Sequence, residues 1–169
     1  MLRSAHFFCC LAICCVLIAE DSPAPPKVTP PKSVEEARSR ARLLHETIRG
    51  SLQVMHRGFF DDDEPDAIPS ASMQDVFDEL ARSYQLKAKW LVVETDVVNV
   101  DHKPADDFER AAVKALADGK TYFEAVEADQ YRSAAAIRLG SQCLKCHLTM
   151  RKSTEARTAG LLISMPLQK

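Results

Sequence analysis

The sequence predicts one α+β domain, in which a long N-terminal helix and further helices flank a central antiparallel sheet. In the first part of the domain, apolar residues recur at helical spacings. Later segments are short and either rich in β-branched residues or alternate between apolar and polar side chains, as strands do. The chain has 169 residues, 46% of them hydrophobic, which is enough for one domain with a real core. A net charge of -2 gives no reason to expect nucleic acid or an anionic membrane as a partner.

Residues 1–19 are predicted to be a signal peptide. Arg3 precedes an apolar stretch of 12 residues, 7–18, and Ala19 is an acceptable cleavage point. The stretch is too short to span a bilayer comfortably. The protein is therefore expected to be exported to the periplasm. The alternative is an N-terminal membrane anchor, retained or lipidated at Cys14, although the bulky Ile13 fits a lipid-attachment site poorly.

Five prolines follow the signal peptide, within residues 20–32. Proline fixes φ and lacks a backbone donor, so this segment should be an extended, semi-rigid tether. Residues 33–169 are then the folded domain.

A long helix should open this domain. Ser33 and Glu36 have the spacing of a capping box. An apolar stripe at spacings of four and three follows them and predicts a helix of about 25 residues. Gly58 and the acidic run 61–64 should end this helix. The stripe consists of Ala37, Ala41, Leu44, Ile48, Leu52, Met55 and Phe59.

A second helix is predicted over residues 72–84, with Ser72 as its N-cap. A strand over residues 88–93 and a loop over residues 99–104 should follow. The residues of the second helix expected to face inward are Val76, Phe77, Leu80, Ala81 and Tyr84.

The second half of the domain should contain one helix and three strands. Asp106 and Glu109 cap the helix, and Gly119 ends it. Residues 120–128 and 130–139 are predicted to be antiparallel strands. In the second, small or apolar side chains on one face alternate with others, including Arg132 and Arg138, on the opposite face. Residues 159–165 should form a last strand that returns to the sheet.

The most specific motif is the C-x-x-C-H run of Cys143, Cys146 and His147. Two cysteines three residues apart on a tight turn can each form a thioether to a haem vinyl group, and the adjacent imidazole then lies beneath the iron. The motif predicts one covalently bound haem c with His147 as the proximal ligand. Loss of the signal peptide would remove the other four of the six cysteines.

Three other interpretations of the motif fit less well. A structural zinc ion needs four protein ligands, and the chain has no second pair of suitable spacing. A thioredoxin-like dithiol lies at a helix start within an early β-α-β unit, whereas this motif lies in about the last 30 residues of the chain. A disulfide between Cys143 and Cys146 would leave His147 unexplained.

The distal ligand is predicted to be His56, with Met55, His45 and His102 as alternatives. His45 and His56 share a helix face roughly 16 Å apart, so one iron cannot bind both. His45 is expected to be a partly exposed surface histidine. His102 lies in a loop, which can follow the iron but cannot position it. His56 has the aromatic neighbours Phe59 and Phe60.

Two further methionines are less suitable as distal ligands. Met150 lies too near His147 in sequence to reach the opposite face of the ring. Met165 belongs to the last predicted strand and should pack in the core. The placement of the motif near the C-terminus also excludes the ordinary small cytochrome c fold.

Several stretches together resemble the family of single-haem c-type cytochrome domains with a PAS-like fold, which was long catalogued as a domain of unknown function. They are DFERAAVKALADGK, YRSAAAIRLGSQCLKCH and TAGLLISMPL. The resemblance covers most of residues 34–167. It implies a central antiparallel sheet, haem at Cys143 and Cys146, His147 as proximal ligand, and a distal ligand from the first helix. Part of the family uses a cysteine there, which this helix lacks.

The resemblance implies either an exported haem protein or an extracytoplasmic sensor. An electron-transfer role with a redox partner protein is the preferred hypothesis, and a redox or gas sensor acting through a separate signalling chain is the alternative. No enzymatic activity is expected. Peroxidase-like chemistry would need an open iron site beside Arg132, Arg138 or His102, and nothing in their spacing demands it.

Overall fold

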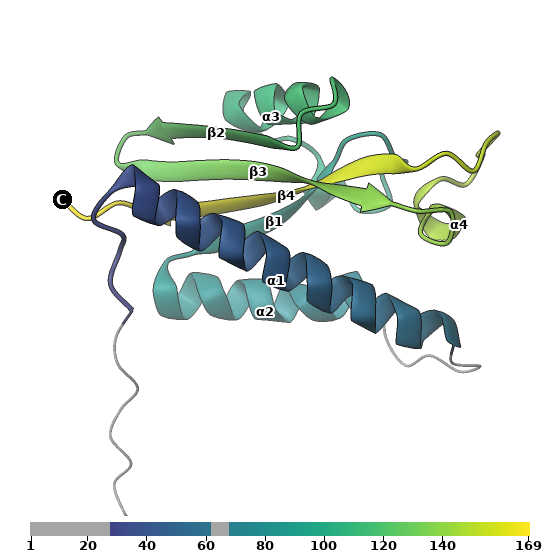
Figure 1. Cartoon of the computed structure of the whole chain (residues 1–169), viewed down its shortest axis with the longest axis horizontal. Coiled ribbons are helices and arrows are strands. Elements are labelled where there is room, and N and C mark those ends of the chain that lie inside the picture. Colours follow the sequence, from purple (N-terminus) through teal and green to yellow (C-terminus); the bar gives the residue numbers. More distant parts are fainter. Residues whose placement is uncertain (1–27, 62–67) are drawn as a thin grey trace, which may run out of the picture.

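The computed structural model describes residues 28–61 and 68–169. A four-stranded antiparallel sheet forms its centre, with the strand order β1-β4-β3-β2 (Figure 1). The helices α1 (Val34–Asp61) and α2 (Pro69–Tyr84) cover one face, and α3 (Asp107–Ala117) covers the other. The predicted α+β fold class is confirmed.

The strands match the predicted segments within a few residues. They are β1 (Lys87–Val92), β2 (Tyr122–Glu127), β3 (Gln130–Leu139) and β4 (Arg157–Pro166). β2 and β3 form a hairpin in which Glu127 pairs with Gln130. Ala128 and Asp129 have φ values of 45° and 65°, as a two-residue hairpin turn with a left-handed backbone requires.

Each face of the sheet has its own apolar cluster. The smaller cluster packs beneath α3, where Phe108 lies 5.4 Å from Phe123 between ring centroids. The larger cluster lies beneath α1 and α2 and extends to the end of β3. Its members include Ile48, Leu52, Phe77, Trp90, Ile137, Leu139, Leu144, Leu161 and Ile163.

The first helix differs from its prediction in its capping box and at Gly58, and it ends at Asp61, the first residue of the acidic run. Ser33 Oγ accepts a hydrogen bond from Glu36 N at 3.2 Å, but the Glu36 carboxylate accepts from Lys32 N at 2.8 Å and does not return to Ser33. The capping box is thus only half formed. The helix also runs through Gly58 to Asp61, because one glycine lowers helix stability without ending a helix that is packed along its length.

The second helix corrects two predictions. It begins at Pro69 and not after Ser72, since proline fits the first helical position, where no backbone donor is needed. Phe77 is buried as expected and lies 4.9 Å from Trp90 between ring centroids. Val76 and Tyr84, expected to face inward, are each 45% exposed because the buried stripe is narrower than predicted.

The third helix forms as predicted. The Asp106 side chain accepts a hydrogen bond from Glu109 N at 2.8 Å, and Gly119 has a φ of 90° beyond the last turn. The Glu109 side chain is buried and binds Lys89 Nζ at 2.6 Å. This ion pair ties α3 to β1.

The end of the predicted tether packs on the domain, which corrects its boundary. Pro31 is fully buried, and its carbonyl accepts a hydrogen bond from Gln168 N at 2.8 Å. The Thr29 carbonyl accepts from Arg40 Nη1 at 2.7 Å. The predicted signal peptide and the first part of the tether lie outside the described residues. Within the described ranges, no helix is long and apolar enough to cross a membrane.

A part-buried polar network joins α1 to the hairpin. Arg38 Nε donates to Glu124 Oε1 at 2.8 Å, and the buried Tyr131 hydroxyl donates to Glu124 Oε2 at 2.6 Å. The hydrogen bond from Arg38 is the main reason that the pKa of Glu124 lies below its ordinary value. Its ionised form is therefore the one that stabilises the fold.

A Glu124→Gln variant should lose about 1–3 kcal/mol of unfolding free energy at pH 7, because two charge-assisted hydrogen bonds are weakened. Since the folded-state pKa of Glu124 is lowered from 4.5, its contribution is complete above that pH and is lost as the pH falls through the folded-state value. Urea unfolding at pH 7 and about pH 3 measures both effects. Glu79→Gln, at an exposed pair with Arg82, is the control and should change little. An equal loss for Glu124→Gln at both pH values would contradict the assignment.

Candidate functional site

The C-x-x-C-H motif forms a short helical turn directly after β3. This turn is α4 (Leu144–His147), and Cys143 is its N-cap. His147 N donates to the Cys143 carbonyl at 3.1 Å, so the first cysteine and the histidine lie one turn apart. Leu144 is fully buried in the larger apolar cluster and fixes the turn against the core. Cys143 is half-buried, Cys146 is exposed, and neither forms a disulfide.

Hydrogen bonds from the segment that follows β1 also hold this turn in place. Asp96 N donates to the His147 carbonyl at 3.0 Å. The Asp96 carboxylate accepts from Thr149 N at 2.8 Å and from Thr149 Oγ1 at 2.7 Å, and these bonds lower its pKa. The backbone on both sides of His147 is therefore fixed. Sequence reasoning missed Asp96, and no local pattern links it to a residue 53 positions later.

Two further histidines interact electrostatically with His147 in this turn. The pKa of His147 is lowered first by burial and then by coulombic interaction with His56 and His102. His56 comes from the C-terminal part of α1, and His102 from the short 3-10 helix η1 (Val100–His102). Figure 1 shows the C-terminal end of α1 and α4 on the same side of the molecule. His56 and His102, but not His45, thus belong to the electrostatic surroundings of His147.

His56 has a defined tautomer. Its Nδ1 lies 2.9 Å from the Leu52 carbonyl, one turn earlier in α1. A carbonyl only accepts, so Nδ1 carries a proton, and in the neutral ring Nε2 carries the lone pair. A backbone acceptor on one ring nitrogen is the usual support of a histidine whose other nitrogen binds a metal.

His102 is held less firmly. Its Nε2 lies 3.4 Å from Asn99 Nδ2, at the long limit for a hydrogen bond. Asn99 caps η1 by accepting from Asp101 N at 2.9 Å, so the predicted loop contains a short ordered turn. Burial lowers the pKa of His102.

The other candidate ligands lie in different surroundings. Met55 is partly buried and packs on the larger apolar cluster together with Cys143. Met165 is buried in that cluster, as predicted, and Met150 is 87% exposed. His45 is 7% exposed and lines a separate pocket between α1 and the hairpin, which corrects its prediction as a surface histidine.

Within the described ranges, no group of three or more His, Cys, Asp or Glu side chains is arranged to hold a metal ion. A haem iron places a smaller demand on the protein, because the porphyrin supplies four of its ligands and side chains supply only the axial ones.

A family model described as Tll0287-like matches residues 31–161, which is more than half of the chain. The chain belongs to the Tll0287-like family. The family resemblance predicted from the sequence is confirmed. Among solved structures, this Tll0287-like domain is similar to the crystal structure of the cyanobacterial heme-protein Tll0287, with a TM-score of 0.61 and 14% identity. The match covers 79% of this chain and 96% of that chain, and it shows a shared fold. A search of curated proteins found no match.

Proposed function

We propose that this protein is an exported single-haem c-type cytochrome that transfers electrons, with haem attached covalently to Cys143 and Cys146. The observation that carries the proposal is the α4 turn itself. It presents two unbridged thiols three residues apart, followed at once by the half-buried His147. That arrangement suits two thioether bonds and one axial imidazole.

The surroundings of the turn fit a haem. Cys143, Leu148 and Met55 all pack against the larger apolar cluster, which would give the porphyrin an apolar surface to contact. Burial lowers the pKa of His147 and so favours the neutral imidazole, the form that can bind iron. Tll0287, whose solved structure shares this fold, is a heme-protein, which supports the same cofactor here.

A bound haem would supply an iron centre that gains and loses one electron. The protein would hold it between two fixed imidazoles. His147 lies on a turn anchored by Asp96, and His56 lies on a long helix with its Nδ1 proton donated to Leu52. We propose His56 as the distal ligand, because the longer hydrogen bond to His102 leaves that ring less firmly oriented. Fixed ligands suit electron transfer, since little rearrangement then accompanies a change of charge.

The predicted export signal and the thiol chemistry support the same compartment. Covalent haem attachment in bacteria takes place outside the cytoplasmic membrane, so we propose a periplasmic protein, free or held by its N-terminus. Its partner would be a separate redox protein.

The purified protein should be low-spin when reduced and should resist carbon monoxide, because a firmly held imidazole must leave before the gas can bind. Absorption spectra of the oxidised, reduced and CO-treated protein measure this. Protein unfolded in denaturant, whose distal ligand is lost, is the control and should bind CO readily. Rapid stoichiometric binding by the folded protein would contradict the electron-transfer role and favour a haem-based gas sensor.

A further inference from the structure

Exposed apolar side chains gather in the two segments that meet at the α4 turn. Met150, Val98 and Val100 are 87%, 73% and 68% exposed, and Leu43 of α1 is 70% exposed. These four are the most exposed large apolar side chains of the described residues, and three of them belong to these two segments. A single exposed valine needs no explanation, whereas a cluster of exposed apolar side chains is typical of a binding site.

Asp96 fastens the chain before Val98 to the α4 turn. Its backbone N donates to the His147 carbonyl at 3.0 Å, and its carboxylate accepts from Thr149 N at 2.8 Å. Two residues of chain span at most about 7 Å, so the Val98 Cα lies within that distance of the Asp96 Cα. Thr149 directly precedes Met150. Both exposed segments are therefore joined at the backbone of the proximal histidine.

The segment with the two valines is ordered and ends at His102, which belongs to the electrostatic surroundings of His147. Asn99 accepts the hydrogen bond that caps η1 and has an extended backbone, with φ −123° and ψ 127°. An extended residue directs the side chains of its two neighbours to the same side of the chain. Val98 and Val100 are these neighbours, so they present one apolar face between two points that both interact with the proximal histidine.

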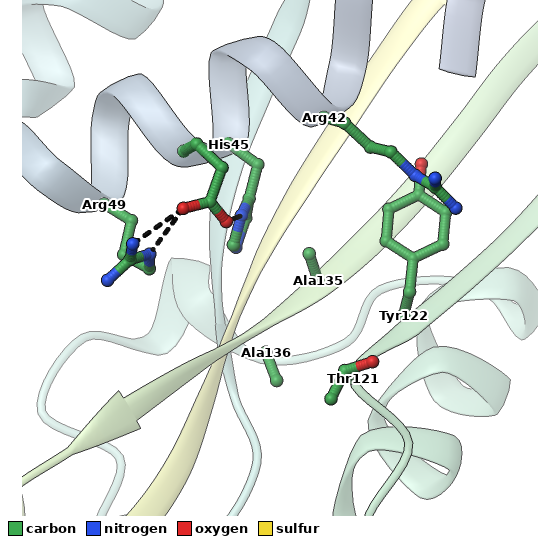
Figure 2. A pocket seen from close by; sticks show the side chains of 8 residues that line it. Arg42, His45, Arg49, Thr121, Tyr122, Ala135 and Ala136 are labelled. Carbon is green, nitrogen blue, oxygen red and sulfur yellow. Dashed lines mark hydrogen bonds and ion pairs between the residues drawn. The ribbon is translucent and has the colours of Figure 1, made fainter. Parts of the chain in front are cut away.

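The part of α1 beside the pocket at His45 provides a comparison surface away from the motif. Figure 2 shows Arg42, His45 and Arg49 on this part of the helix, on the side that faces the hairpin. Leu43 lies in the same stretch and is as exposed as the two valines. It precedes His56 by 13 residues, which is about 20 Å along the helix.

We infer that Val98, Val100 and Met150 form an apolar wall of the haem site. This inference rests on the proposed attachment of haem to Cys143 and Cys146. The three side chains would contact the apolar surface of the porphyrin and exclude water from it, which is favourable for both. Burial of this kind is also one of the means by which a protein sets the reduction potential of a haem.

The reduction potentials of Val98→Asp and Val100→Asp in the full-length haem protein test this inference. A carboxylate beside the ring favours the more positive ferric state, so both potentials should shift below that of the unmodified protein. Leu43→Asp is the matched control and should not shift, because its distance of about 20 Å exceeds the screening length of about 10 Å in 0.1 M salt. Spectroelectrochemical titration measures all three. Equal potentials in the three variants would overturn the inference.

Proton nuclear magnetic resonance of the reduced protein tests the contact without a change of charge. The ring current of a porphyrin shifts the signals of methyl groups that touch it. Shifted valine signals should therefore disappear in Val98→Ala or Val100→Ala and persist in Leu43→Ala. The mass of each denatured protein shows separately whether haem is attached. A protein without attached haem would overturn the proposed function together with this inference, whereas attached haem without shifted valine signals would overturn this inference alone.

Discussion

A variant with both Cys143→Ser and Cys146→Ser is expected to lose all covalent haem. Serine is close to cysteine in size but cannot form a thioether, and haem that is held by axial ligands alone is released when a protein is denatured. Any haem retained in the folded variant should therefore pass into acidified organic solvent, while the haem of the unmodified protein should stay with the chain. Extraction followed by absorption spectroscopy of both phases measures the difference.

The single variants provide the control for this experiment. Cys143→Ser and Cys146→Ser each keep one thioether, so each should retain some covalent haem. Haem that remains bound to the denatured double variant would show that another residue carries it. Equal extraction from the double variant and the unmodified protein would contradict attachment at these cysteines.

The His56→Ala variant should change the haem from low-spin to high-spin, or leave an open sixth position, because alanine removes the proposed distal imidazole. Low-temperature electron paramagnetic resonance and absorption spectra report this change. His45→Ala is the matched control on the same helix and should stay low-spin, since His45 lines the separate pocket. A low-spin His56→Ala protein, together with a changed spectrum in Met55→Ala or His102→Ala, would transfer the ligand assignment to that residue.

The features that the sequence predicted well depend on near neighbours in the chain. The α1 stripe, the Asp106 cap and the β2-β3 hairpin each depend on residues that lie close together in the chain, and all three form as expected. The α4 turn belongs to the same class, because its residues span a single helical turn. Local pattern was therefore sufficient for the fold class and for the position of the motif.

The features that were missed depend on contacts between distant segments. His45 was expected at the surface, but it is buried because the hairpin crosses that part of α1. The bonds from Asp96 to Thr149 and from Arg38 to Glu124 join residues far apart in sequence. Periodicity on one helix cannot say which strand will cover it, so neither the pocket at His45 nor the hydrogen bonds from Asp96 that anchor the motif were predictable.

The mass of the intact, denatured, mature protein tests the proposed haem attachment most directly. Covalent attachment through Cys143 and Cys146 predicts the mass of the chain plus one haem, and it predicts the loss of that addition in the double serine variant. A protein isolated with haem that shows only the mass of the bare polypeptide after denaturation would contradict a c-type cytochrome.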